Sequence, residues 1–150
     1  MITEDYVTYE VGLLLREKGF DEICEMFYCK PNEGYKNNLV KREWRNSALR
    51  EDMVCTCPTV YLAMKWLREI HNIDIDIKAE VGMLQVKRYV PVVKTYHPKY
   101  DEELGRDRLN QKSHSTSKPL KGEMFPVYED FATYEEACNE AIKYCLEKLI

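Results

Sequence analysis

The chain has 150 residues, of which 45% are apolar and 32% charged, and its formal net charge is −4. This composition excludes a disordered or fibrous protein, and the length suits one domain, residues 1–150, that buries about 68 to 70% of its unfolded surface. No run of apolar residues approaches a membrane span, and the start, MITEDYVTYE, lacks the features of a secretory signal, so we expect a cytoplasmic protein with six reduced cysteines and no membrane partner.

A helix and then a strand are expected in the first thirty residues. Thr8 is a typical N-cap, YEVGLLLREKG has apolar residues at helical spacing, and Gly19 suits a left-handed cap, so the helix is expected at 9–18. DEICEMFYCKP contains aromatic residues and ends at a proline, which indicates a strand at 23–29. Residues 32–54 are polar and show no clear period, so we expect loop there, with room for one short strand.

A second helix and strand are expected in the middle of the chain. Pro58 suits the first helical position, and Asn72 suits a left-handed C-cap, which predicts a helix at 58–71. Its apolar residues recur at steps of three, at Tyr61, Met64, Leu67 and Ile70. The alternation in IDIDIK predicts a half-buried strand at 73–78 with its isoleucines toward the core, as is typical of an antiparallel sheet.

Further strand and loop segments follow. Residues 83–97 predict one long strand or two short ones divided at Pro91, because proline cannot donate to a ladder and belongs at an edge or a break. Residues 98–123 are polar, and we expect a mobile loop there, either functional or simply disordered. MFPVYED, residues 124–130, can form a further short strand.

The chain closes with a strong helix signal. Thr133 and Glu136 form a T-x-x-E capping box, in which each side chain accepts a hydrogen bond from the other residue's backbone N–H. One side of this helix carries Ala137, Ala141, Cys145 and Leu149. The elements follow the order α-β-α-β-β-(β)-α, which predicts an α+β fold with two or three helices on one face of a small antiparallel sheet.

The cysteines raise the question of a metal or reaction site. Zinc sites usually use C-x₂-C pairs, whereas the spacing here is C-x₄-C at Cys24 and Cys29 and C-x-C at Cys55 and Cys57. We expect small buried thiols and no metal, with a zinc site as the alternative. A helix N-cap would lower the pKa of Cys57 and activate it as a nucleophile, but His71 would lie roughly 20 Å away along the helix and cannot be its base.

The usual motifs for phosphate binding and hydrolysis, GxxxxGK[ST], GxGxxG, HExxH and GxSxG, do not occur. We therefore name no catalytic residue and no cofactor, and we expect a non-enzymatic accessory protein that binds another protein. Two alternatives remain open: a small metal-binding or hydrolytic protein that uses cysteine and histidine, and a nucleic-acid-binding protein.

The nucleic-acid alternative rests on the distribution of charge. Residues 1–26 and 122–150 each sum to −5, whereas residues 27–121 sum to +6. Within that middle part, the strand at 85–99 and the loop at 98–121 combine cations with aromatic rings, as single-stranded nucleic-acid binding requires. The candidate residues are Lys87, Arg88, Tyr89, Lys94, Tyr96 and Lys99. The competing interpretation is that the cations protect an edge strand while the tyrosines half-bury on the sheet.

A second basic stretch, residues 36–50, surrounds Trp44. Its cations are Lys36, Lys41, Arg42, Arg45 and Arg50. An exposed tryptophan here would be a suitable anchor for a protein interface, and core packing of the ring is the alternative.

Three segments also carry a resemblance to known proteins. These are ITEDYVTYE with LLLREKGFDE near the start, P-T-x-x-x-A-M-K-W-L-R-E-x-H in the middle, and T-Y-E-E-A with A-I-K-Y-C-L-E-x-L-I at the end. In these segments the chain resembles small uncharacterised proteins common in gut Bacteroides and in their phages and mobile elements. The resemblance implies a bacterial or phage cytoplasmic setting and supplies neither a function nor a catalytic residue.

Overall fold

The computed structural model describes residues 3–30, 39–81, 86–97, 110–115 and 130–150. Within these ranges the α-helices are α1 (Tyr9–Glu17), α2 (Val60–His71) and α4 (Tyr134–Tyr144), and α4 continues into a π-helical turn, Cys145–Leu149. The strands are β1 (Cys24–Cys29), β2 (Leu39–Trp44), β3 (Met53–Thr56), β4 (Ile73–Val81), β5 (Lys87–His97) and β6 (Asn110–Ser115). None of these helices is both long and apolar enough to cross a membrane.

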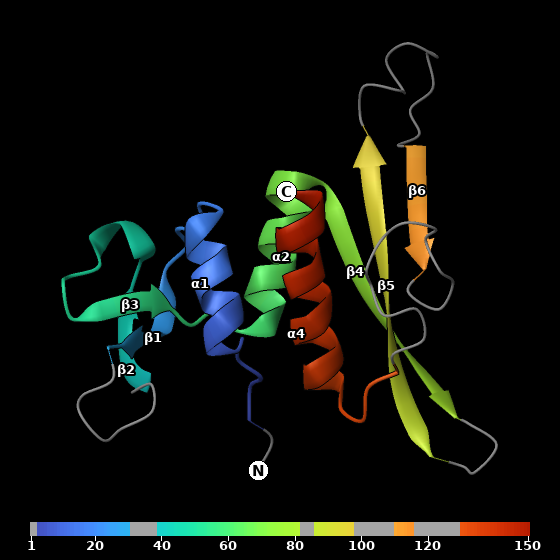
Figure 1. Cartoon of the computed structure of the whole chain (residues 1–150), viewed down its shortest axis with the longest axis horizontal. Helices are drawn as coiled ribbons and strands as arrows, with labels where there is room; N and C mark the ends of the chain where they lie inside the picture. The colour runs from blue at the N-terminus through green and yellow to red at the C-terminus, as the bar shows by residue number, and fades with distance from the viewer. Residues whose placement is uncertain (1–2, 31–38, 82–85, 98–109, 116–129) are drawn as a thin grey trace.

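The predicted α+β fold is confirmed, but the strands form two antiparallel sheets rather than one. The first sheet has the order β2-β1-β3 and the second the order β4-β5-β6. The helices lie between the two sheets (Figure 1). Strands β2 and β3 fall in the segment expected to be mostly loop. Strand β2 was hard to predict because its sequence, LVKREW, shows no apolar alternation, and none of its residues is fully buried.

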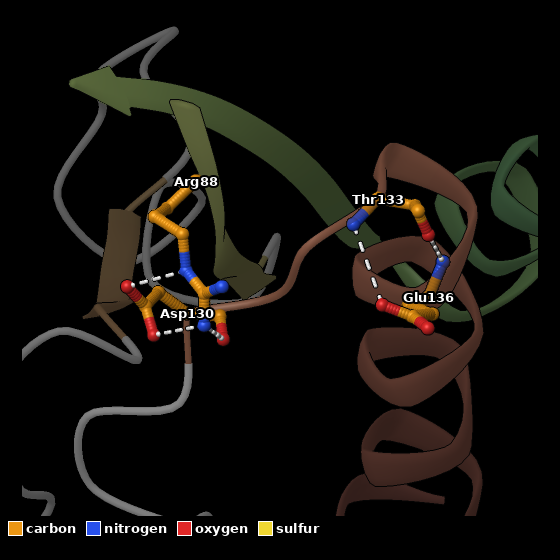
Figure 2. A network of polar contacts seen from close by, with 4 residues as sticks. All are labelled: Arg88, Asp130, Thr133 and Glu136. Atoms are coloured by element: carbon orange, nitrogen blue, oxygen red, sulfur yellow. Dashed lines mark hydrogen bonds and ion pairs between the residues drawn. The ribbon is translucent and has the colours of Figure 1, made fainter. Parts of the chain in front are cut away.

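The ends of the helices follow the expected capping chemistry. The Thr8 hydroxyl accepts a hydrogen bond from the Val11 N–H, and Gly19 ends α1 with a φ of +88°. The capping box of α4 is present: the Glu136 N–H donates to the Thr133 hydroxyl at 3.1 Å, and the Thr133 N–H donates to the Glu136 carboxylate at 3.3 Å (Figure 2). These contacts confirm the predicted starts of α1 and α4.

Helix α2 differs from its prediction at its start and on its buried face. Its N-cap is Thr59, whose hydroxyl accepts from the Leu62 N–H at 3.2 Å, so Pro58 precedes the helix and does not begin it. Tyr61 and Ile70 are 69% and 61% exposed, although the steps of three assigned both to the core. Steps of three drift around a helix that has 3.6 residues per turn. The predicted C-cap is confirmed, since Asn72 has a φ of +56°.

The second sheet explains how Pro91 fits inside a strand. The alternation predicted for β4 is confirmed, with Ile73 and Ile75 buried against the helices. Strand β5 is continuous and central: β4 pairs along one side, and on the other side β6 begins to pair at Val92 while Tyr89 forms a bridge with Phe131. The Tyr89 N–H donates toward Phe131, and Pro91, two residues later, has its nitrogen on the same side of β5. Pro91 lies between the bridge at Tyr89 and the start of β6 pairing at Val92, so no hydrogen bond of the ladder is lost there.

The core of the molecule lies where the three helices meet the two sheets. Its fully buried members include Leu15 of α1, Phe20 in the segment after α1, Leu67 of α2 and Ile142 of α4. In the segment expected to be a mobile loop, residues 110–115 form β6, while residues 98–109 and 116–123 lie outside the described residues. The short strand expected at 124–130 lies outside them too, except for its last residue.

Candidate functional site

The predicted basic strand does not present its side chains on one face. Alternation along β5 places Lys87 and Tyr89 on the same side as Val93, which is buried against the helices, and places Arg88 and Lys94 on the opposite side. Tyr96 belongs to β5, but its side chain is outside the described part of the chain, as is Lys99. The structure therefore separates the four described side chains into two pairs.

Two of the three described cations of β5, Arg88 and Lys94, have ion-pair partners within the protein. The Arg88 guanidinium donates to both carboxylate oxygens of Asp130, at 2.9 and 3.0 Å, and to the Asp130 carbonyl oxygen at 3.1 Å (Figure 2). Lys94 lies 3.8 Å from the carboxylate of Asp76. The hydrogen bonds from Arg88 lower the pKa of Asp130, so this carboxylate stays charged and neutralises the arginine. The Lys87 ammonium lies 5.1 Å from the ring centroid of Tyr89.

The thiols are buried and protonated. Cys57 lies two residues before the N-cap of α2, and burial raises its pKa instead of lowering it. Its thiol donates to the Val7 carbonyl oxygen at 3.5 Å, and this oxygen also accepts from the Tyr28 hydroxyl at 3.1 Å. Burial likewise raises the pKa of Cys24 to about 11 and that of Cys55 to about 12. At neutral pH these thiols are weak nucleophiles.

The same thiols do not gather with further metal ligands. Cys24 and Cys57 line one cavity of about 200 Å³. Within the described ranges, however, no three side chains of the histidine, cysteine, aspartate or glutamate type come close enough together to hold a metal ion.

A larger cavity, of about 340 Å³, lies where α2 and α4 begin, and we call it the tyrosine pocket. Its wall is formed by Thr3, Glu4, Asp5, Thr59, Val60, Tyr61, Met64 and Tyr134. The N-terminal segment is fixed across the start of α2, because the Val60 N–H donates to the Asp5 carbonyl oxygen at 2.9 Å and the Val7 N–H donates to the Pro58 carbonyl oxygen at 3.0 Å. These backbone bonds hold the two acidic side chains beside the first turn of α2.

The tyrosine pocket combines aromatic rings with uncompensated negative charge. Tyr61 and Tyr134 are 69% and 44% exposed, and no lysine or arginine is among the described residues of the wall. Neither Glu4 nor Asp5 has an ion pair with another described residue. Burial raises the pKa of Tyr134, with smaller contributions from Cys138 and from the carboxylates of Asp76 and Asp5. The rings and carboxylates of the wall are therefore suited to a ligand group that has an apolar stem and a positively charged end.

Sequence reasoning missed this site for a physical reason. The pocket joins three segments far apart in the chain, near residues 4, 60 and 134, and no local pattern reports that they meet. Tyr61 was assigned to the core stripe of α2, and the acidic start was noted only as net charge. The one available signal was the combination of an acidic N-terminus with tyrosines at two helix starts.

Comparison of the chain with protein-family models, with curated proteins and with solved structures finds no match. The geometry of the tyrosine pocket is therefore the basis on which its role is assigned.

Proposed function

We propose that this chain is a non-enzymatic accessory protein that binds a lysine or arginine side chain of a partner protein in the tyrosine pocket. The observation that carries the proposal is that Glu4 and Asp5, which have no ion pair with another described residue, lie beside the exposed rings of Tyr61 and Tyr134. A cation over a tyrosine ring is attracted by the ring electrons, and carboxylates add charge-assisted hydrogen bonds. The volume of about 340 Å³ lies within the range of ligand sites and accepts one long side chain.

The composition of the wall favours binding over catalysis. Its described residues include no cysteine, histidine or lysine, and the Thr59 hydroxyl is already engaged as the N-cap of α2. A hydrolytic site would need a nucleophile with an adjacent base. Cys24, Cys55 and Cys57 are buried with raised pKa values, which supports the same choice.

We place this interaction in the cytoplasm of a bacterial cell, in a chromosomal or phage-encoded setting. The support for the setting is the resemblance in the three segments quoted from the sequence. Reduced thiols suit such a compartment.

The proposal is tested by titrating ¹⁵N-labelled protein with acetyl-arginine amide and acetyl-lysine amide, and following backbone amide shifts. We expect saturable shifts at residues 3–6, at 59–64 and at Tyr134. The neutral acetyl-norleucine amide and the anionic acetyl-glutamate amide should give smaller shifts or none. Equal shifts with the neutral and the cationic probes would contradict the charge-based role.

Two variants sharpen this titration. The double variant Glu4→Gln and Asp5→Asn removes both charges and keeps the backbone hydrogen bond from the Val60 N–H to the carbonyl oxygen of residue 5. We expect at least about a tenfold loss of affinity for the cationic probes, since a hydrogen bond to a charged group contributes about 1.5 to 3 kcal/mol. The matched control is Glu51→Gln, an exposed acid outside the pocket, which should bind like the wild type.

A further inference from the structure

The outer side of the first sheet carries a group of three residues that we call the arginine cluster: Arg42, Trp44 and Arg50. The Arg42 guanidinium lies 5.1 Å, and that of Arg50 5.6 Å, from the centroid of the Trp44 ring. Arg42 lies two residues before Trp44 on β2, where the pairing with β1 is irregular, and Arg50 follows the short helical turn Asn46–Ala48. Both arginines are exposed, and the tryptophan is half-buried.

The cluster is held in place by bonds that do not involve its charges. The Trp44 indole N–H donates to the Ala48 carbonyl oxygen at 2.9 Å, and the ring packs beside the buried ring of Phe27 at 6.3 Å between centroids. Asn46 ties the following turn to the body, donating to the Phe20 carbonyl oxygen at 2.7 Å and accepting from the Thr56 N–H at 3.0 Å. The ring is therefore fixed before any ligand binds.

The two guanidinium groups have no ion pair and no hydrogen bond with another described residue. Both positive charges lie beside one ring, with the guanidinium carbons 5.1 and 5.6 Å from its centroid. Ring contacts attract each cation but do not neutralise it. An anion at this surface would gain the forked hydrogen bonds of both guanidinium groups and would relieve their mutual repulsion.

We propose that the arginine cluster binds single-stranded nucleic acid, with Arg42 and Arg50 on two phosphates and the Trp44 ring fixing their positions. Exposed cations around an aromatic ring are the combination that tracks a phosphate backbone. The proposal is independent of the tyrosine pocket, which is formed by other residues and is proposed to bind a cation instead of an anion.

The test measures the fluorescence anisotropy of labelled dT₁₅ and rU₁₅ with the purified full chain at 50 and 200 mM KCl. Two phosphate contacts to a single strand predict a slope of about −1.4 in log K against log salt, and hence about a sevenfold loss of affinity between these concentrations. The double variant Arg42→Gln with Arg50→Gln should lose at least about tenfold in affinity at 50 mM KCl. The matched double variant Lys87→Gln with Lys94→Gln should stay within about twofold of the wild type.

A second measurement guards against a variant that does not fold. In the ¹⁵N-labelled wild type, dT₁₅ should shift the indole N–H signal of Trp44 and leave that of Trp66, which is buried, unchanged. The proposal is overturned by no binding at 50 mM KCl, by equal losses in the two double variants, or by an unshifted Trp44 signal. It is also overturned if polyglutamate of the same charge displaces dT₁₅ at equal concentration, since the partner would then be an acidic protein segment.

Discussion

The tyrosine pocket and the arginine cluster are alike in chemistry and opposite in sign. Each places aromatic rings beside charges that have no counter-ion among the described residues, carboxylates in the pocket and guanidinium groups in the cluster. The pocket is a cavity between helix starts, whereas the cluster is an open face of a sheet. Strand β5 has three cations, of which Arg88 and Lys94 are paired with Asp130 and Asp76, while Lys87 lies beside the ring of Tyr89. The comparison separates the charges that the described part of the fold pairs from those that it leaves without a counter-ion, and both proposals rest on the second kind.

The largest effect is expected from reversing the charge of the pocket. The double variant Glu4→Lys and Asp5→Lys should abolish the binding of acetyl-arginine amide, because two cations would then face the ligand cation. The anionic acetyl-glutamate amide should now produce shifts at the same amides. Affinity of the variant for dT₁₅ at the arginine cluster should change by less than about twofold in the same buffer. A variant that still bound the arginine probe would show that the carboxylates do not define the site.

A smaller effect is expected from ionising the thiols of the core that supports both regions. The raised pKa values of Cys24 and Cys138, about 11, and of Cys55, about 12, mean that the folded state favours the neutral thiols. Their contribution to stability is fully present below the unfolded pKa of 9.0 and is lost as the pH rises through the folded values. The free energy of unfolding should fall above pH 9 by at most about 1.4 kcal/mol per pH unit for each thiol.

Urea titrations under reducing conditions at pH 8 and pH 10.5 measure this loss. The Cys55→Ala variant should show a smaller difference between the two pH values than the wild type, since one ionising thiol is gone. If the pocket and the cluster stand on one core, the signals of Tyr134 and of the Trp44 indole should disappear together. A pH-independent free energy of unfolding would contradict the assignment of buried neutral thiols.

The smallest effect is expected from removing a helix cap next to the pocket. Thr133→Ala breaks the capping box of α4 immediately before Tyr134, while Thr8→Ala removes the N-cap of α1, away from the pocket wall. Both should lower the free energy of unfolding by about 1 kcal/mol. Only Thr133→Ala should weaken the binding of acetyl-arginine amide, because it loosens one wall of the pocket. Equal binding by both variants would mean that Tyr134 contributes nothing to recognition.

Local chemistry made much of the fold predictable. Thr8 with Gly19, and Thr133 with Glu136, mark helix ends through contacts within a few residues, and IDIDIK carries its own register. Strand β2 was not predictable in this way, since its pairing with β1 comes from backbone bonds to a distant segment. The division into two sheets likewise depends on which strands meet.

The sites depended even more on distant contacts. The basic residues of β5 were recognised, but the neutralising Asp130 is 42 positions away from Arg88. The sequence shows a basic stretch around Trp44, but it does not show that Arg42 and Arg50 both approach the ring of Trp44. The pairing of charges is a property of the folded chain, and it distinguishes Arg88 and Lys94 from the charges of the two proposed surfaces.

The most direct measurement is one titration series on a single ¹⁵N-labelled sample, first with acetyl-arginine amide and then with dT₁₅, each at 50 mM KCl. We predict two separate sets of shifts, the first at residues 3–6, 59–64 and Tyr134, and the second at residues 41–50 with the Trp44 indole. Shifts from either ligand that centre on residues 87–94, or no saturable shift from either, would contradict the claim that unpaired charge marks the binding surfaces of this protein.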